Sequence, residues 1–310
     1  MKKILKISAI AAAVAVAGAC QRGEKSGAAG PTVALVMKTL NNPFFMDMQQ
    51  GAEGAARRLG IHLISQAAER EVDVEKQMQI IENLIQRQVG VICVSPSGSR
   101  EIIPAILKAN RAGIPVIAVD TRVDSAALQQ AGGEIAAFVG SDNVQGGRIA
   151  GEFIADKLNG RGKIAVLEGI PGHETGDARL RGFHSAIRQN PGIEIAASQT
   201  ANWERDQGYN VFQNILQSHP GIEAVFACND MMALGAVEAI AAIGRTGEIL
   251  VVGFDAVTDA QQAIRRGAMH GTIAQNPAEM GRIAVERASD LLQGKTIAKN
   301  IPVKIELISR

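Results

Sequence analysis

Short apolar runs alternate with segments of helical periodicity along almost the whole chain after residue 31. Compact apolar runs bounded by polar or turn-forming residues are typical of buried strands, and apolar residues three or four positions apart are typical of helices. The pattern predicts strands at Val33–Met37, His62–Gln66, Val91–Ser95, Val116–Asp120, Ala136–Gly140, Lys163–Glu168, Glu194–Ser198, Ala224–Cys228, Leu250–Gly253 and Gly271–Ala274. It predicts helices between them, including one after Pro43 and others at Val74–Gln88, Asp142–Leu158, Met231–Ile243 and Ala278–Leu292.

This alternation of strands and helices predicts an α/β fold with parallel sheets and right-handed crossovers. One sheet of ten strands is possible, but two sheets of about five strands each fit the length better, given the usual size of a domain. The turn at Ser141–Asn143 is a candidate for the passage from one sheet to the other.

The first strand, turn and helix suggest a ligand site. Asn42 follows the first strand, Pro43 opens the helix, and Phe44 and Phe45 stand at the junction. Ligands of parallel α/β sheets bind at the carboxyl ends of the strands, where these side chains lie. An Asn helix cap with two core Phe residues explains the same pattern.

The N-terminal segment is a candidate export signal. Lys2, Lys3 and Lys6 precede the apolar stretch 7–19, which is too short to span a membrane. We expect residues 1–19 to be a signal peptide, Cys20 to be a lipidation site, and 20–30 to be a flexible lipoprotein tether. Ordinary signal cleavage that leaves a free Cys20 is the alternative.

Composition excludes several other classes of protein. The formal net charge of +1 predicts no basic surface for nucleic acid. Cys93 and Cys228 lie in apolar strand candidates, so buried thiols are expected there rather than a disulfide or metal pair. We find no metal-ligand cluster, no nucleotide-binding Gly motif and no nucleophile–base pair, and we expect no catalytic residue, metal or cofactor. His173, in a Gly-rich loop, is the one His that could line a site.

Polar or aromatic side chains follow the carboxyl ends of seven predicted strands or the loops after them. They are Asn42, Asp120, Arg179, Trp203, Asn229, Asp255 and Gln275. Carboxylates and amide oxygens accept hydrogen bonds from sugar hydroxyls, while Arg, Lys and amide nitrogens donate to them. Aromatic rings such as Phe44, Phe45 and Trp203 cover the C–H faces of a sugar ring. The set therefore indicates a polyhydroxyl-binding site.

The chain resembles the sugar-binding proteins of bacterial ABC importers, in particular the ribose- and allose-binding group. The likeness extends from Thr32 to about Ile308 and is carried by a set of short motifs. These are Thr39–Phe45, Ser141–Val144 with Gly146 and Gly147, Ala197–Gln199 with Trp203, Phe226–Asp230, Val252–Asp255 and Ile273–Gln275.

The resemblance implies two similar doubly wound parallel-sheet lobes joined by a three-segment hinge. The crossings are expected near Ser141–Asp142, Gln275–Asn276 and Lys304–Ile305. The N-terminal lobe would comprise 31–141 plus 276–304, and the C-terminal lobe 142–275 plus 305–310. Carried over residue by residue, the implied sugar contacts are Lys38, Asn42, Phe44, Phe45, Asp120, Arg179, Trp203, Asn229, Phe254, Asp255 and Gln275.

The resemblance implies a non-enzymatic protein outside the cytoplasm that delivers a monosaccharide to an ABC permease. We expect a monomer in the periplasm or at the extracytoplasmic face of a bacterial membrane, attached to the membrane only through a lipid anchor. A chemoreceptor is a candidate partner besides the permease. Lys38 and Trp203 match the allose-binding members and favour a hexose, whereas Thr121 stands where the ribose binder has Arg. Ribose or inositol binding, or a receptor for a sugar-like signal in chemotaxis or cell-to-cell communication, are the alternatives. A repressor would need a DNA-binding domain where the export signal lies, and an exported hydrolase or isomerase would need the missing nucleophile–base pair.

Overall fold

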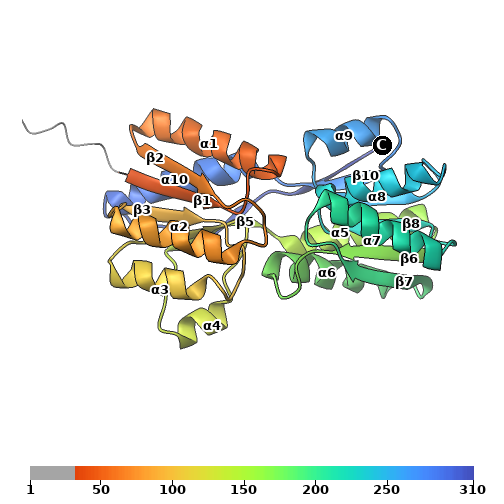
Figure 1. The fold of residues 1–310 in the computed structure, drawn as a ribbon, viewed down its shortest axis with the longest axis horizontal. Coiled ribbons are helices and arrows are strands. Elements are labelled where there is room, and N and C mark those ends of the chain that lie inside the picture. The colour runs from red at the N-terminus through yellow and green to blue at the C-terminus, as the bar shows by residue number, and fades with distance from the viewer. Residues whose placement is uncertain (1–31) are drawn as a thin grey trace, which may run out of the picture.

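The computed structural model describes residues 32–310, which form two α/β lobes side by side (Figure 1). The predicted signal peptide, the tether and Cys20 lie outside the described residues. The first lobe holds strands β1 (Thr32–Met37), β2 (His62–Ala67), β3 (Val91–Val94), β4 (Val116–Val119), β5 (Ala137–Ser141) and β11 (Asn300–Val303). The second holds β6 (Arg161–Glu168), β7 (Gly192–Thr200), β8 (Ala224–Ala227), β9 (Leu250–Asp255), β10 (Gly271–Ala274) and β12 (Glu306–Ser309).

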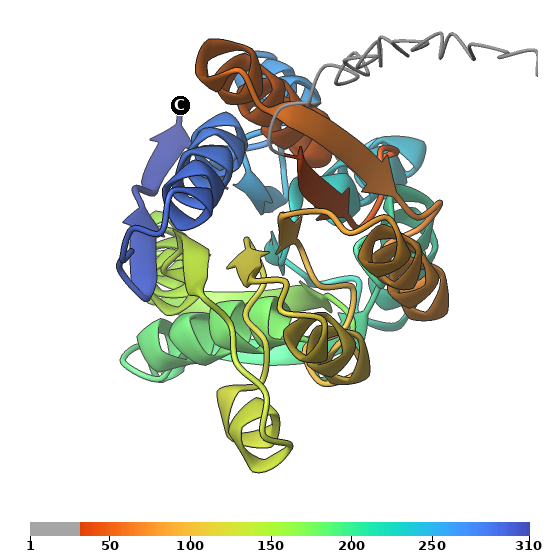
Figure 2. The same cartoon turned by 90° about the vertical axis from the view of Figure 1, so that its left-hand side faces the viewer.

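Helices cover both faces of each sheet. In the first lobe, α1 (Pro43–Leu59) and α10 (Pro277–Leu292) pack on one face, with α2 (Val74–Gln86) and α3 (Ile103–Arg111) on the other (Figure 2). The short helix α4 (Ser125–Gln130) completes this lobe. The second lobe carries α5 (Asn143–Lys157), α6 (Glu174–Ile187), α7 (Arg205–Ser218), α8 (Asp230–Ala242) and α9 (Thr258–Arg265).

The two sheets repeat one topology, with strand orders β11-β5-β4-β3-β1-β2 and β12-β10-β9-β8-β6-β7. All neighbouring strands are parallel except β10 and β12. This is the doubly wound arrangement, in which the strand order reverses beside β1 and again beside β6. The predicted fold class, two similar doubly wound lobes, is confirmed.

Each sheet has six strands rather than the expected five, because β11 and β12 add one edge strand to each. The apolar residues Ile301, Val303, Ile305 and Leu307 alternate with polar ones and Pro302, as in half-exposed edge strands. The alternation is too short to stand out from a loop in the sequence.

The chain passes between the sheets at three places. β5 ends at Ser141 and α5 begins at Asn143; β10 ends at Ala274 and α10 begins at Pro277; β11 ends at Val303 and β12 begins at Glu306. The purple-blue connections cross between the lobes in Figure 1. Side chains that follow the strand ends of both lobes therefore face one shared cleft.

Candidate functional site

A cavity of about 270 Å³ lies between the carboxyl ends of the two sheets. Its lining comes from both lobes: Lys38, Asn42, Phe44, Phe45, Glu71, Asp120, Thr175, Arg179, Trp203, Asn229 and Asp255.

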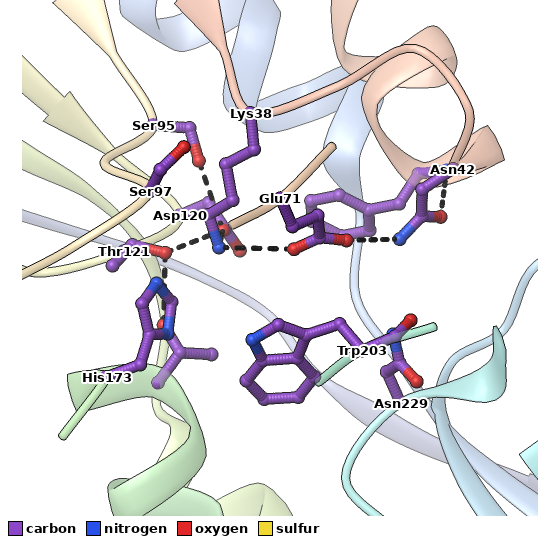
Figure 3. A network of polar contacts seen from close by, with 12 residues as sticks. Lys38, Asn42, Glu71, Ser95, Ser97, Asp120, Thr121, His173, Trp203 and Asn229 are labelled. Atoms are coloured by element: carbon purple, nitrogen blue, oxygen red, sulfur yellow. Dashed lines mark hydrogen bonds and ion pairs between the residues drawn. The ribbon is translucent and has the colours of Figure 1, made fainter. Parts of the chain in front are cut away.

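On the first-lobe wall, a buried Lys lies between two carboxylates (Figure 3). Lys38 Nζ is 3.7 Å from Glu71 Oε2 and 3.5 Å from Asp120 Oδ2, and only 3% of Lys38 is exposed. Ser95 and Thr121 each donate a hydroxyl hydrogen bond to Asp120 Oδ2, at 3.2 and 3.0 Å. The cluster offers a small ligand one cation and several carboxylate oxygens within a few ångströms.

On the second-lobe wall, two hydrogen bonds and a stacked aromatic ring fix the guanidinium group of Arg179, a residue of α6. Its Nε donates to Asn143 Oδ1 at 2.9 Å, and its Nη1 donates to the Cys228 carbonyl at 2.6 Å. Nη1 also lies 3.6 Å from Asp255 Oδ1, and the guanidinium carbon is 3.7 Å from the centre of the Phe254 ring. Because the stacked ring fixes its plane, this guanidinium is oriented before a ligand arrives.

Aromatic rings line both sides of the cavity. Phe44 and Phe45 meet edge to face, with ring centres 5.2 Å apart. Trp203 lies against Gly169, where a Cβ would come within 2.0 Å of its ring, so glycine is required at that position. Within the described residues the buried Trp203 Nε1 donates no hydrogen bond. The rings provide an apolar surface between two polar walls.

Three lining residues adopt left-handed backbone conformations: φ is 64° at Asp120, 68° at Trp203 and 115° at Asp255. Non-glycine residues rarely adopt such angles, and each instance costs about 1–3 kcal/mol. These turns aim the side chains into the cleft directly after their strands or loops. Backbone strain of this kind is concentrated at functional sites.

The lining carries three carboxylates and two cations. Burial raises the pKa of Asp255 to about 7, against the lowering effect of Arg179 and of the hydrogen bond from Gln275. Burial also raises the pKa of Glu71, although Lys38 opposes the shift. Hydrogen bonds donated by a ligand to these carboxylates would favour their charged forms.

The structure brings nine of the eleven predicted contacts to the cavity, and the other two lie just behind it. Phe254 stacks under Arg179, and Gln275 Nε2 donates to Asp255 Oδ1 at 2.8 Å. Asn42 and Asn229 are also helix caps, accepting from Phe44 N and Met232 N. The cap and site interpretations of Asn42 are therefore compatible.

Sequence reasoning missed Glu71 and Thr175 among the lining residues. Glu71 lies in the loop after β2, so applying the strand-end rule to that strand would have found it. Asn42 Nδ2 donates to its Oε1 at 3.1 Å, a contact between two distant loops that no local pattern reveals. Thr175 belongs to α6, four positions before Arg179.

The two lobes touch across the cleft. His173 Nε2 lies 3.2 Å from the Pro96 carbonyl, Glu174 N donates to Ser99 Oγ at 3.0 Å, and the Thr175 and Thr121 hydroxyls are 3.1 Å apart. His173 is thus a contact between lobes and not a cavity-lining residue, and burial lowers its pKa well below the usual value. The cleft is closed in this conformation.

Within residues 32–310, no group of His, Cys, Asp and Glu side chains could hold a metal ion. None of the helices in the described part of the chain is long and apolar enough to cross a membrane.

Comparison with known proteins places the chain in a family. The model of the periplasmic binding protein domain matches residues 33–296. The ribose import binding protein of Bacillus subtilis is 40% identical, in an alignment that covers 89% of this chain and 87% of that protein's length. The D-allose-binding periplasmic protein of Escherichia coli is 36% identical over 91% and 92%. The crystal structure of an ABC transporter periplasmic solute-binding protein from Actinobacillus succinogenes with bound D-allose is 40% identical, covers 90% of this chain and 97% of that one, and has a TM-score of 0.86.

The comparisons agree with the two lobes and the interlobe cavity. The chain therefore belongs to the periplasmic binding protein family, within the group of ribose- and allose-type sugar-binding proteins of ABC transporters, which bind solutes and are not enzymes.

Proposed function

We propose that this protein captures one monosaccharide, with a hexose such as D-allose preferred, in the interlobe cavity and delivers it to an ABC permease. The observation that carries the proposal is a small closed cavity in which charged hydrogen-bonding groups from both lobes surround aromatic rings. A charged partner makes a hydrogen bond to a hydroxyl worth ~1.5–3 kcal/mol, so several such bonds select a polyhydroxyl ligand.

The preference for a hexose rests on the pair formed by Lys38 and Glu71, and on Trp203. Glu71 and Asp120 already neutralise the Lys38 ammonium, so a pentose would not leave this cation unpaired. The pair instead adds a donor and an acceptor on one wall, and these suit an extra hydroxyl or hydroxymethyl group. The indole of Trp203 covers more of a six-membered ring than a phenyl ring would. The D-allose complex at 40% identity agrees with this choice, but the ribose import binding protein of Bacillus subtilis is equally similar, so the preference rests on the lining residues.

Calorimetric titration against allose, psicose, ribose, galactose and myo-inositol tests the assignment. We expect a hexose to bind at least about tenfold more tightly than ribose, the value of one charge-assisted hydrogen bond. Ribose binding ten times more tightly than every hexose would reject the preference, while leaving sugar binding intact. Failure of all monosaccharides would reject the proposed function.

A paired substitution tests the role of Lys38 and Glu71. Lys38→Ser alone would leave Glu71 and Asp120 facing each other, so it is combined with Glu71→Gln. The double variant should lose affinity for hexoses more than for ribose. An equal loss for both sugars would show that the pair does not select between them.

We also propose that the lobes open and close about the three crossing segments, with 31–141 plus 276–304 moving against 142–275 plus 305–310. Ligand groups contacting both walls bind fully only in the closed state, so the ligand stabilises closure. Small-angle scattering should give a smaller radius of gyration with sugar than without it. The hinge would be contradicted if the radius of gyration were the same with and without sugar and larger than that of the closed structure.

The lipid anchor at Cys20 is a separate proposal, supported by the basic and apolar segment before it and the polar tether after it. Mass spectrometry of the protein from its native membrane should find a diacylglycerol-modified N-terminus at Cys20. An unmodified Cys20 in that fraction would exclude the anchor.

A further inference from the structure

Asp230 is a buried carboxylic acid that the cavity does not use. It is the first residue of α8, directly after the lining residue Asn229, and it is fully buried. It forms no salt bridge with any residue of the described chain, 32–310. A buried carboxyl without a cation is costly unless its oxygens accept good hydrogen bonds.

Both oxygens of Asp230 hold the segment that follows β9. Thr272 Oγ1 donates to Asp230 Oδ1 at 2.7 Å, and Val257 N donates to Oδ2 at 2.9 Å. The same Thr272 hydroxyl accepts from Ala256 N at 3.2 Å. We call Asp230 and Thr272 the support pair.

The segment held by the support pair has an unusual backbone. Asp255 has a φ of 115° and Ala256 a φ of 57°, so two successive non-glycine residues adopt left-handed conformations. Such a backbone persists only where surrounding contacts determine it. At Gly253 a Cβ would lie 2.1 Å from Asp230 Oδ1, so the absent side chain is what allows the carboxyl to approach.

The conformation of this segment decides where the Asp255 carboxylate lies. In the closed structure it is 3.6 Å from Arg179 Nη1 and accepts from Gln275 Nε2 at 2.8 Å. A change of φ at Asp255 or Ala256 would move the carboxylate away from both partners and out of the cavity.

We propose that Asp230 and Thr272 are positioning residues for the sugar site, which fix the backbone of Asp255 and Ala256 and so hold the Asp255 carboxylate against the ligand. The inference rests on the proposed function, since it requires a ligand that contacts Asp255. The support pair acts from behind the cavity wall, and neither residue lines the cavity.

Burial without a cation, together with the nearby Asp255, raises the pKa of Asp230 well above its usual range. The groups that face it are Thr272, the backbone amides of Ala256 and Val257, and the carboxylate of Asp255. Removing the Thr272 hydroxyl would leave the Ala256 amide and one oxygen of Asp230 unsatisfied, which favours rearrangement of the segment.

The test is a double-mutant cycle with Asp255. Thr272→Val removes the hydroxyl at nearly constant shape, Thr272→Ser retains it, and Asp230→Ala removes the other half of the support pair. Ser289→Ala, which deletes a buried hydroxyl of α10 far from this segment, is the matched control. Dissociation constants for the tightest monosaccharide are measured in the wild type and in an Asp255→Asn background.

In the wild-type background we expect Thr272→Val and Asp230→Ala to weaken binding by about tenfold or more. Thr272→Ser and Ser289→Ala should stay within about threefold of wild type. In the Asp255→Asn background, the first two changes should cost less than about threefold, because they act through the carboxylate that is already gone.

Equal losses in both backgrounds would show a merely structural role and overturn the proposal. Urea titration of each variant confirms that the protein is folded at the assay temperature, and Thr272→Ser provides the comparison if Thr272→Val is unstable. If Thr272→Val and Asp230→Ala bind like the wild type, only the positioning role fails. If the wild type binds no monosaccharide, the proposed function fails and the positioning role fails with it.

Discussion

Gly147→Ala should damage the sugar site without touching the cavity. Gly147 lies in α5 where this helix crosses α6, and a Cβ there would be 1.9 Å from the Arg179 carbonyl oxygen, 2.7 Å from its carbon and 2.9 Å from its Cα. Ordinary contact begins at 3.4 Å, so the helices must separate by about 1.5 Å (3.4 minus 1.9). The atoms that obstruct the methyl group are backbone and cannot rotate away.

The energetic cost follows from two opposing effects. Overpacking a close contact costs about 1–3 kcal/mol. Replacing Gly by Ala inside a helix returns about 0.5–1 kcal/mol. The two ranges combine to a net loss of about 0–2.5 kcal/mol in the free energy of unfolding, with a middle value of about 1 kcal/mol.

The separation also reaches the proposed sugar site, because α6 carries the cavity-lining Arg179. A shift of about 1.5 Å would lengthen the 2.9 Å bond from Arg179 Nε to Asn143 and the 2.6 Å bond to the Cys228 carbonyl beyond hydrogen-bonding distance. Losing one charge-assisted contact to the sugar weakens binding by about tenfold or more.

Gly54→Ala is the matched control. Gly54 lies in α1, its φ is not left-handed, and a Cβ there meets nothing within 4 Å. This change should stabilise the protein by about 0.5–1 kcal/mol and leave the sugar affinity unchanged. Urea unfolding and calorimetric titration of both variants give the comparison. If Gly147→Ala unfolds and binds as Gly54→Ala does, the close helix contact does not position Arg179.

Three further predictions follow from burial and charge. Burial raises the pKa of Asp255 from 3.8 to about 7, so between these pH values the folded state binds a proton that the unfolded state does not. The free energy of unfolding should therefore fall as pH rises from about 4 to 7, by at most ~1.4 kcal/mol per pH unit. The difference in unfolding free energy between wild type and Asp255→Asn isolates this slope, and a flat difference would contradict the raised pKa. Burial also raises the pKa of the Cys93 and Cys228 thiols to about 12. In a chain without its first 30 residues, which removes Cys20, these two thiols should not react with a thiol reagent at pH 8 until denaturant is added. Rapid labelling of the native protein would refute this. Arg70→Ala removes an exposed ion pair across the cleft, in which Arg70 Nε lies 3.4 Å from Glu204 Oε1. The sugar dissociation constant, measured by calorimetry, should change by less than about fivefold. A larger change would make this ion pair part of the closure mechanism.

The strands, the helices and the sheet edge at which the candidate site lies could all be predicted from the pattern of residues along the chain. Strands and helices follow from the period of apolar residues, which is a local property, and the parallel alternation implies that all carboxyl ends meet at one edge. That argument located Asn42, Asp120, Asn229 and Asp255 without knowledge of any contact. The resemblance to the family added Lys38, which directly follows β1 and has no signal of its own in the apolar pattern.

The contacts that these residues make with one another could not be predicted in this way, because they join distant parts of the chain. Lys38 reaches Glu71 and Asp120 because β1, β2 and β4 all end at the same edge of one sheet. Partners so far apart in the sequence leave no local pattern. His173 became a contact between lobes because closure buries it against the Pro96 carbonyl.

The support of Asp255 is likewise a tertiary property. The left-handed backbone at Asp255 goes against the intrinsic preference of the residue, and it is maintained by Asp230 and Thr272 from two other elements. Propensity and periodicity describe what a segment does alone. A strained backbone exists because distant groups outweigh that preference, so it becomes visible only in the folded chain.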